Sequence, residues 1–183
     1  MNTETIACKP IGGQQPGMSG PRKTTRDFMQ PGHVATVIQS IFNAIKGAEG
    51  KTFVVGGDGR YFNAEAIQTI LKMAAANGAA KVIVGQNGLL STPAASHLIR
   101  LNRADGGIIM SASHNPGGAD GDFGIKFNIA NGGPAPTSFT DATYEISKGL
   151  SEYKIAEIND IPLDRQHTCH IGEMQIDVID SVS

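Results

Sequence analysis

The chain has 183 residues, of which 40% are hydrophobic, and this length and composition indicate one domain of ordinary size with a core of its own. Its formal net charge is −2 and its lysines and arginines are scattered, so we expect no nucleic-acid partner. No apolar run approaches the ~20 residues that span a bilayer, and no charged-then-apolar leader begins the chain, so we expect a cytoplasmic protein without a membrane partner.

Residues 1–32 are rich in glycine, proline and polar residues, and they predict an N-terminal arm and a loop with at most one short strand. The first strong helix follows, because apolar side chains recur at three- and four-residue spacing from Val34 to Ile45. Gly47 and Gly50 are expected to end this helix.

The next part of the chain contains two similar units, each an apolar strand, a glycine-rich turn and an amphipathic helix. In KTFVVGGDGR, Phe53–Val55 predict a buried strand, and the helix of this unit spans Asn63–Ala76. In KVIVGQNGLL, Val82–Val84 predict the strand and Gly-Gln-Asn-Gly the turn. The second helix is expected to have Thr92 as its N-cap and Pro93 at its first position.

A third strand, Gly107–Met110, leads directly into the sequence SASHNPGG at residues 111–118. FGIKFNI then predicts a strand with a hairpin-like return, and Thr137–Lys148 predict a helix. The inward side chains of this helix are expected to be Phe139, Ala142 and Ile146. Short strands that alternate with amphipathic helices indicate an α/β fold with a mixed, largely parallel sheet sandwiched between helices. Ligands bind such sheets at the carboxyl ends of the strands, where the three glycine-bearing loops fall.

Ser113 follows a buried strand and precedes His114 in a tight turn, so the sequence places a small hydroxyl beside a potential proton carrier. Phosphoryl or acyl transfer uses a nucleophile positioned in this way, and the glycines that follow would let backbone N–H groups converge on an anion. Serine, asparagine, proline and glycine are also ordinary turn residues. The local chemistry alone therefore leaves a functional loop and a surface turn both open.

Several other functional motifs are missing from the sequence. There is no G-x-S-x-G elbow of an α/β-hydrolase and no G-x-x-x-x-G-K-[ST] phosphate loop, and GGDGRY lacks the full dinucleotide fingerprint. His167 and His170 flank Cys169 without the spacing of a zinc site, and we expect them at the surface.

Several longer motifs follow one another along the chain. PGMSGPRK lies at residues 16–23, VVGGDGRYF at 54–62 and NGLLSTPAASHLIR at 87–100, and SASHNPGG continues as GDFGIKFN at 121–128. In this order they resemble the N-terminal domain of the α-D-phosphohexomutases, most closely the branch that acts on glucose phosphates. The family signature reads T-A-S-H-N-P-G-G, so Ser111 replaces its threonine, and we expect Ser111 to brace the loop.

The resemblance implies a phosphoryl-transfer mechanism. The family's signature serine, here Ser113, carries a phosphoryl group that it donates to glucose 1-phosphate or glucose 6-phosphate. In the family, glucose 1,6-bisphosphate is the intermediate and the activating phosphoryl donor. The resemblance also implies that Mg²⁺ would bind an oxygen of the phosphorylated serine and take its other ligands from a D-G-D-G-D-type loop in the next domain. We therefore expect a first domain that needs its remaining mutase domains in cis and is inactive as residues 1–183 alone.

The resemblance also implies roles for residues around Ser113. His114 would contact the phosphoryl group or transfer a proton, unless it is an ordered turn residue. Lys126 would be a proton carrier and charge partner, unless it is an edge-strand lysine that keeps the sheet soluble. Asn115 would support the loop. Asp58 and Arg60 would either brace their loop as an ion pair or bind substrate.

The loop PGMSGPRK would hold phosphate through Arg22, with Ser19 and Gly20 shaping the loop. It departs from the family's P-G-T-S-G-L-R-K, because Met18 replaces a threonine and Pro21 a leucine. Proline fixes φ and removes one N–H donor, which alters the conformations open to this loop.

These inferences divide the chain into three parts. Residues 1–32 would form the arm and active-site loop, residues 33–165 the α/β phosphoserine domain, and residues 166–183 a terminal strand or a linker to the next domain. Two alternatives stay open for function. One is a relative that acts on mannose or glucosamine phosphates, and the other is a catalytically inactive relative that serves as a scaffold or secretion-linked phosphoprotein.

Overall fold

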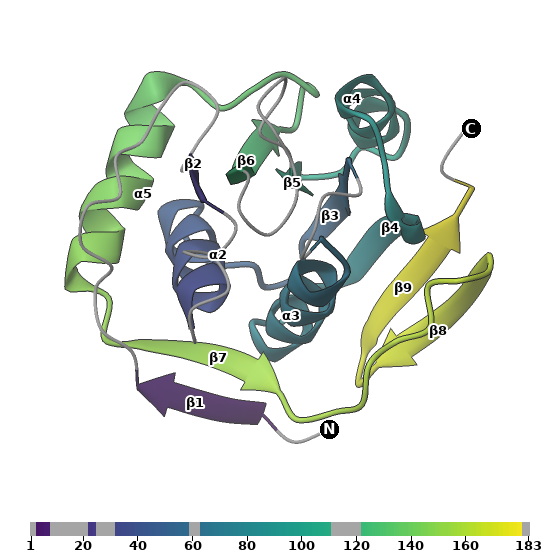
Figure 1. The fold of residues 1–183 in the computed structure, drawn as a ribbon, viewed down its shortest axis with the longest axis horizontal. Coiled ribbons are helices and arrows are strands. Elements are labelled where there is room, and N and C mark those ends of the chain that lie inside the picture. The colour runs from purple at the N-terminus through teal and green to yellow at the C-terminus, as the bar shows by residue number, and fades with distance from the viewer. Residues whose placement is uncertain (1–2, 8–21, 25–31, 59–62, 111–121, 181–183) are drawn as a thin grey trace.

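The computed structural model describes residues 3–7, 22–24, 32–58, 63–110 and 122–180. Within these ranges a mixed sheet carries helices on both faces (Figure 1), which confirms the expected α/β class. None of the helices in these ranges is both long and apolar enough to cross a membrane.

A seven-stranded sheet forms the centre of the fold. Across the sheet, its strands are β2 (Arg22–Thr24), β6 (Asp122–Ile129), β5 (Gly106–Met110), β3 (Thr52–Gly57), β4 (Lys81–Leu89), β9 (Met174–Ile179) and β8 (His167–Ile171). The neighbours among β5, β3, β4 and β9 pair in parallel, whereas β2, β6 and β8 pair antiparallel at the two margins. Central parallel strands are buried on both faces, which explains their continuous apolar sequences.

Helices cover the two faces unequally. The helices are α2 (His33–Ala44), α3 (Asn63–Ala76), α4 (Thr92–Leu101) and α5 (Thr137–Gly149). Because successive residues of a strand point to opposite faces, Phe53 and Val55 pack in the large core with α2 and α3, and Val54 packs in a smaller core with α4. In Figure 1, α5 lies outside α2, and α4 lies on the other side of the sheet.

The N-terminal segment contributes more structure than the sequence indicated. Two strands were found where at most one was expected: β1 (Thr3–Ala7) pairs antiparallel with β7 (Glu152–Ala156), and β2 pairs antiparallel with β6. Both pairings join segments that are far apart in the chain, so no local pattern reveals them. Figure 1 shows β1 and β7 as a small separate sheet beside the ends of the helices.

The strands and helices of the two expected units are confirmed, with two corrections in the second unit. Its strand does not end at Val84 but continues as β4 through Leu89, because Asn87 (φ 59°) and Gly88 (φ 76°) turn in the left-handed region and the chain then rejoins β3. The N-cap of α4 is Ser91 and not Thr92, since the Ser91 hydroxyl accepts a 3.2 Å hydrogen bond from the Ala94 N–H.

The expected inward face of α5 is partly wrong. Ala142 is exposed, whereas the small polar residues Thr140, Thr143 and Ser147 are buried. Each hydroxyl donates to a carbonyl of its own helix, at 2.6–2.9 Å, so these side chains enter the helix interface without an unpaired donor. The spacing of apolar residues cannot predict that these threonines and this serine face inward, because their side chains are polar.

Residues 166–183 were expected to form a terminal strand or a linker. Their described part forms the hairpin β8–β9, which turns at Gly172 (φ 58°) and joins the main sheet beside β4. Ile171, Met174 and Ile176 are buried in the large core. This segment is therefore a structural part of the same sheet.

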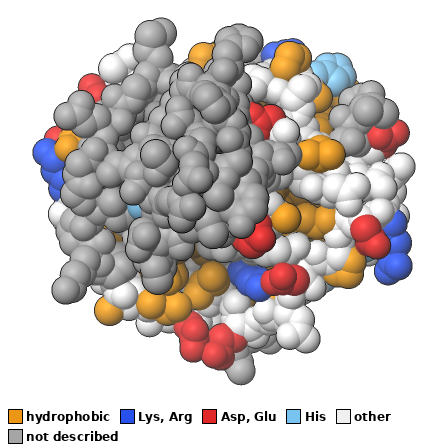
Figure 2. Space-filling view, viewed as in Figure 1, with side chains coloured by type: hydrophobic (Ala, Val, Ile, Leu, Met, Phe, Trp, Pro, Cys, Tyr) orange, Lys and Arg blue, Asp and Glu red, His pale blue; other side chains and the backbone are white. Residues whose placement is uncertain are grey.

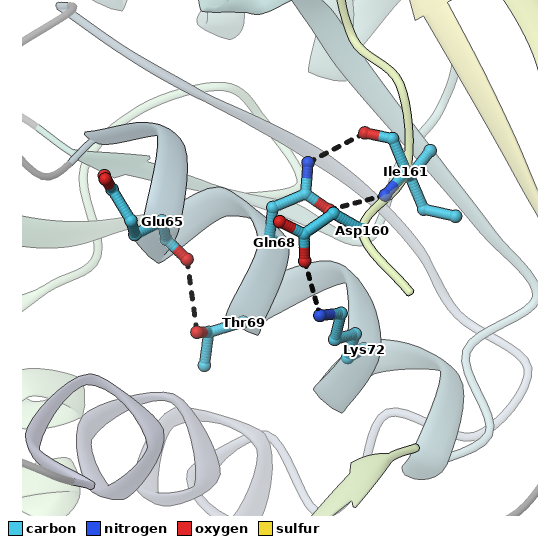
Figure 3. Close-up of polar contacts among 6 residues, drawn as sticks. All are labelled: Glu65, Gln68, Thr69, Lys72, Asp160 and Ile161. Atoms are coloured by element: carbon cyan, nitrogen blue, oxygen red, sulfur yellow. Dashed lines mark hydrogen bonds and ion pairs between the residues drawn. The ribbon is translucent and has the colours of Figure 1, made fainter. Parts of the chain in front are cut away.

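The connection from β7 to β8, residues 157–166, is held as a strap along α3 (Figure 3). The Gln68 amide donates to the Ile161 carbonyl and accepts from the Ile161 N–H, both at 2.8 Å. Lys72 forms a 2.6 Å ion pair with Asp160. At its far end the strap meets the β4 turn, where the Asn87 N–H donates to the Leu163 carbonyl at 2.6 Å.

Replacement of Gln68 by alanine should destabilise the protein by about 1–2 kcal/mol, because both backbone groups of Ile161 would lose their partner. The matched control is Thr69→Ala on the same helix, since among the described residues the Thr69 hydroxyl donates only to the Glu65 carbonyl of its own helix. That control should change the free energy of unfolding by less than about 0.5 kcal/mol. Equal losses in urea unfolding of both variants would contradict the strap's role.

The Asp177 carboxylate on β9 provides a second stability test. Burial alone would raise its pKa, but hydrogen bonds from Gln175, Lys81 and Thr168 outweigh burial and lower the pKa below its ordinary value. The stabilisation is therefore present above the unfolded pKa, which is about 3.9, and is lost as the pH falls through the lower folded value.

Asp177→Asn should lower the free energy of unfolding at pH 7 by about 0.5 kcal/mol. In the variant, the free energy of unfolding should also decrease less steeply as the pH falls below about 4. Urea unfolding of both proteins from pH 7 down to pH 2.5 measures this difference. An equally steep acid loss in the variant would show that Asp177 does not contribute to it.

Candidate active site

Three parallel strands end side by side at the carboxyl edge of the sheet. The Asp58 N–H, just after β3, donates to the carbonyl of Met110, the last residue of β5, at 3.1 Å. On the other side, the Leu90 N–H after β4 donates to the Gly57 carbonyl at 2.8 Å. Ligands bind open α/β sheets at this edge, and the chain leaves β5 here toward residues 111–121, which contain Ser113.

Gly57 makes this close approach possible. A Cβ at this position would overlap Asn63 Oδ1 and would lie 2.7 Å from the Met110 carbonyl oxygen. Since real Cβ atoms do not approach a backbone oxygen so closely, any larger residue would push apart the ends of β3 and β5. The glycine in VVGGDGR is therefore a spatial requirement of the edge.

Lys126 lies near the same edge on β6. It pairs with Ile109, one residue before the end of β5, and its side chain is half-buried. Ile125 and Phe127 point into the large core, so Lys126 points to the face that carries α4. The backbone of Arg22 pairs with Gly124 two residues earlier on β6, which brings Arg22 and Lys126 to the same margin of the sheet.

The structure describes only some of the expected site residues. Asp58, exposed at the end of β3, Lys126 and the backbone of Arg22 are grouped around the end of β5. Outside the described residues lie Ser19, Gly20, Arg60, Ser113, His114 and Asn115. The roles of all these residues stay predictions.

Charges are mixed on the face seen in Figure 2. Lysine and arginine side chains of the described residues are interspersed there with aspartate and glutamate. Within the described ranges, no group of three or more His, Cys, Asp or Glu residues is placed to hold a metal ion.

A family model described as phosphoglucomutase/phosphomannomutase, alpha/beta/alpha domain I, matches residues 13–154. The chain belongs to this family. The match includes β2 to β6 and therefore every residue that we expected at the site, from Ser19 to Lys126.

Curated relatives within the family carry the name phosphoglucomutase. The one from Rhizobium radiobacter is 54% identical over 180 residues, which are 98% of this chain and 33% of the relative. A chloroplastic phosphoglucomutase from Brassica napus is 50% identical over 182 residues, which are 98% of this chain and 29% of the relative. The chain thus spans about a third of the length of these relatives.

Solved structures of the family match the fold. The open form of the exocytosis-sensitive phosphoprotein pp63/parafusin, a phosphoglucomutase from Paramecium, has a TM-score of 0.92 and 40% sequence identity. The match covers 98% of this chain and 35% of that one. A putative phosphomannomutase from Thermus thermophilus, at 24% identity and a TM-score of 0.67 over 82% of this chain and 34% of that one, shares the fold.

Sequence reasoning missed one residue at the edge of this family domain. Asn63, the first residue of α3, is 3% exposed, and its Nδ2 donates to the Gly88 carbonyl at 3.1 Å. The sequence marked Asn63 only as the start of a helix. No local pattern signalled this contact, because the carbonyl that Asn63 binds belongs to Gly88, 25 residues further along the chain on β4.

Gly57→Ala should destabilise the protein by about 2–4 kcal/mol, because the new methyl group would overlap Asn63 and approach the Met110 carbonyl. Gly149→Ala is the control, since a Cβ at Gly149 meets nothing within 4 Å. The control should leave stability unchanged or raise it by about 0.5 kcal/mol. Chemical unfolding measures both, and equal stability of the two variants would refute the crowding at Gly57.

Proposed function

We propose that the chain is the N-terminal domain of a phosphoglucomutase that interconverts glucose 1-phosphate and glucose 6-phosphate. The main support is the identity of 47–54% to phosphoglucomutases of other organisms over nearly the whole chain. The sequence SASHNPGG between β5 and β6 supports the same conclusion, because it would start from the carboxyl edge where parallel sheets bind ligands.

In this proposal Ser113 carries the phosphoryl group. The bond from phosphorus to the Ser113 oxygen breaks and a bond from phosphorus to the free hydroxyl oxygen of the sugar phosphate forms, while that hydroxyl loses its proton and the released Ser113 oxygen gains one. The resulting glucose 1,6-bisphosphate reorients and returns its other phosphoryl group to Ser113, so the enzyme ends as it began. His114 and Lys126 are the proposed proton carriers.

Positive charge and positioning account for most of the catalysis of phosphoryl transfer. Arg22 and Lys126 are suited to this task, since their backbones lie on paired strands beside the end of β5. Ser19 and Gly20 would shape the phosphate-binding loop that leads into β2, and Asp58, Arg60 and Asn115 would support the edge.

Mg²⁺ prefers oxygen ligands, and a phosphoryl oxygen on Ser113 is the one such ligand that we assign to this chain. The ion would neutralise negative charge on the transferring group. We propose that its other ligands, and most contacts to the sugar, come from further domains in cis, because the relatives are about three times as long as this chain.

The cytoplasmic location stays a prediction. Relatives from Brassica napus and Arabidopsis thaliana are named as chloroplastic, so the family is not restricted to one compartment. Substrate choice also stays open toward mannose phosphates, since the family description includes phosphomannomutase.

A second candidate is a phosphoprotein whose role does not depend on turnover. It is favoured by the likeness to pp63/parafusin, which is described as exocytosis-sensitive as well as a phosphoglucomutase. Phosphorylation at Ser113 without sugar-phosphate interconversion would support this candidate.

Ser113→Ala in the full-length protein should reduce turnover of glucose 1-phosphate at least about a thousandfold, because the phosphoryl carrier is removed. A coupled assay for glucose 6-phosphate measures the loss, and phosphopeptide mapping after incubation with glucose 1,6-bisphosphate should find phosphate on Ser113 of the unaltered protein.

Ser138→Ala is the control for this experiment, because Ser138 is an exposed residue of α5. This variant should retain full turnover, and residues 1–183 alone should show none. A Ser113→Ala protein that still interconverts the two glucose phosphates would end the proposal.

A further inference from the structure

Asn63 lies where the ends of three strands meet. We propose that Asn63 is a positioning residue for phosphoryl transfer: its side-chain amide sets the ends of β3, β4 and β5 relative to one another, and thereby the point from which the Ser113 loop starts. The inference rests on the proposed function for its catalytic consequence, but its structural part can be tested separately.

The side-chain NH2 group of Asn63 contacts β4. Asn63 Nδ2 donates to the carbonyl oxygen of Gly88 at 3.1 Å, in a buried position. Gly88 belongs to the left-handed turn of β4, and the same turn is held from the strap by the Asn87–Leu163 hydrogen bond. The β4 turn is thus fixed from both sides, and Asn63 is its contact toward the carboxyl edge.

The acceptor side of the amide faces β3. Since the Gly88 carbonyl requires an N–H donor, the hydrogen bond determines which way the amide is turned and directs Oδ1 toward Gly57. A Cβ on Gly57 would overlap Oδ1, so the oxygen lies in the direction of one Cα–H of that glycine. Such Cα–H···O contacts are weak but directional.

Gly57 lies between Asn63 and the end of β5. A Cβ on Gly57 would also lie 2.7 Å from the Met110 carbonyl oxygen, so Asn63 and Met110 crowd the same side of Gly57. The next residue, Asp58, donates its N–H to that Met110 carbonyl at 3.1 Å. Met110 is the last residue of β5 and directly precedes residues 111–121, which include Ser113, so displacement of Asn63 would move the end of β5 from which the chain continues to Ser113.

The free-energy cost of burying the Asn63 amide favours a positioning role for this residue over a role in packing alone. Asn63 is 3% exposed, and Oδ1 has no hydrogen-bond partner among the described residues. A buried acceptor without a partner opposes folding, so an amide is a costly residue if the position needs only packing. Small displacements of a catalytic group can reduce turnover about a hundredfold, which gives a reason to retain the amide at this edge.

Asn128 is a matched control. It is 2% exposed, its Nδ2 donates to the Gly132 carbonyl at 3.1 Å and to the Ser96 hydroxyl at 3.2 Å, and its Oδ1 has no partner among the described residues. However, it pairs with Gly107 near the start of β5, at the opposite end of that strand from Met110. The two asparagines therefore share their burial, a hydrogen bond to a glycine carbonyl and a buried Oδ1, but they differ in their distance from the carboxyl edge.

The experiment compares Asn63→Ala and Asn128→Ala in the full-length protein, with Asn63→Ser as a milder variant. Three quantities are measured: the melting temperature, kcat and KM for glucose 1-phosphate, and hydrogen exchange of the Asp58 amide. Both alanine variants should melt at similarly lowered temperatures. Only the Asn63 variants should lose kcat, by about ten- to a hundredfold with KM within about twofold, and exchange the Asp58 amide at least about tenfold faster.

Each other outcome counts against the inference. Unchanged kcat and Asp58 exchange in Asn63→Ala would overturn it, and so would an equal loss of both in Asn128→Ala. Failure of both Asn63 variants to fold, while Asn128→Ala folds, would make Asn63 a residue of general stability. If the unaltered protein shows no mutase turnover, the proposed function fails, and the exchange of the Asp58 amide still decides the structural part.

Discussion

The close approach of β3 to β5 at Gly57 is the constraint on which the candidate site depends. The Met110 carbonyl and the Asn63 amide occupy the space that any side chain on Gly57 would need. Without a side chain there, the chain after β3 comes within hydrogen-bond distance of β5, at 3.1 Å between the Asp58 nitrogen and the Met110 oxygen. Every candidate residue that the structure describes lies within a few residues of this contact or on the paired strands next to it.

The pairing of β2, β6 and β5 at this margin of the sheet brings two candidate site residues to the carboxyl edge. Because β6 runs antiparallel to β5, its first residues return to the edge from which the intervening segment departs, and Ile125 pairs with Met110. The next strand, β2, pairs with the same part of β6. Lys126 and Arg22 therefore lie near the end of β5, although they are about a hundred residues apart in the chain.

The share of the relatives that this chain covers fits a division of tasks among domains. The chain spans about a third of the length of relatives named phosphoglucomutase, and in the proposed function it supplies the phosphoryl carrier and part of its charge environment. In the proposed function, a phosphoserine that exchanges its group with two different hydroxyls would need a fixed starting point. The strap, the β4 turn and the Asn63 amide would support that point from the interior of the fold.

Local patterns in the sequence determined the helices α2 and α3, the central strands and the glycine motifs that mark the family. They could do so because helix and strand periodicities and turn residues act over a few neighbouring positions. Tertiary structure alone decided the pairing of β1 with β7, the polar inward face of α5, and the contact of Asn63 with Gly57 and Gly88. These features depend on segments that are distant in the chain and on hydrogen bonds within the core, and neither leaves a periodic trace in the sequence.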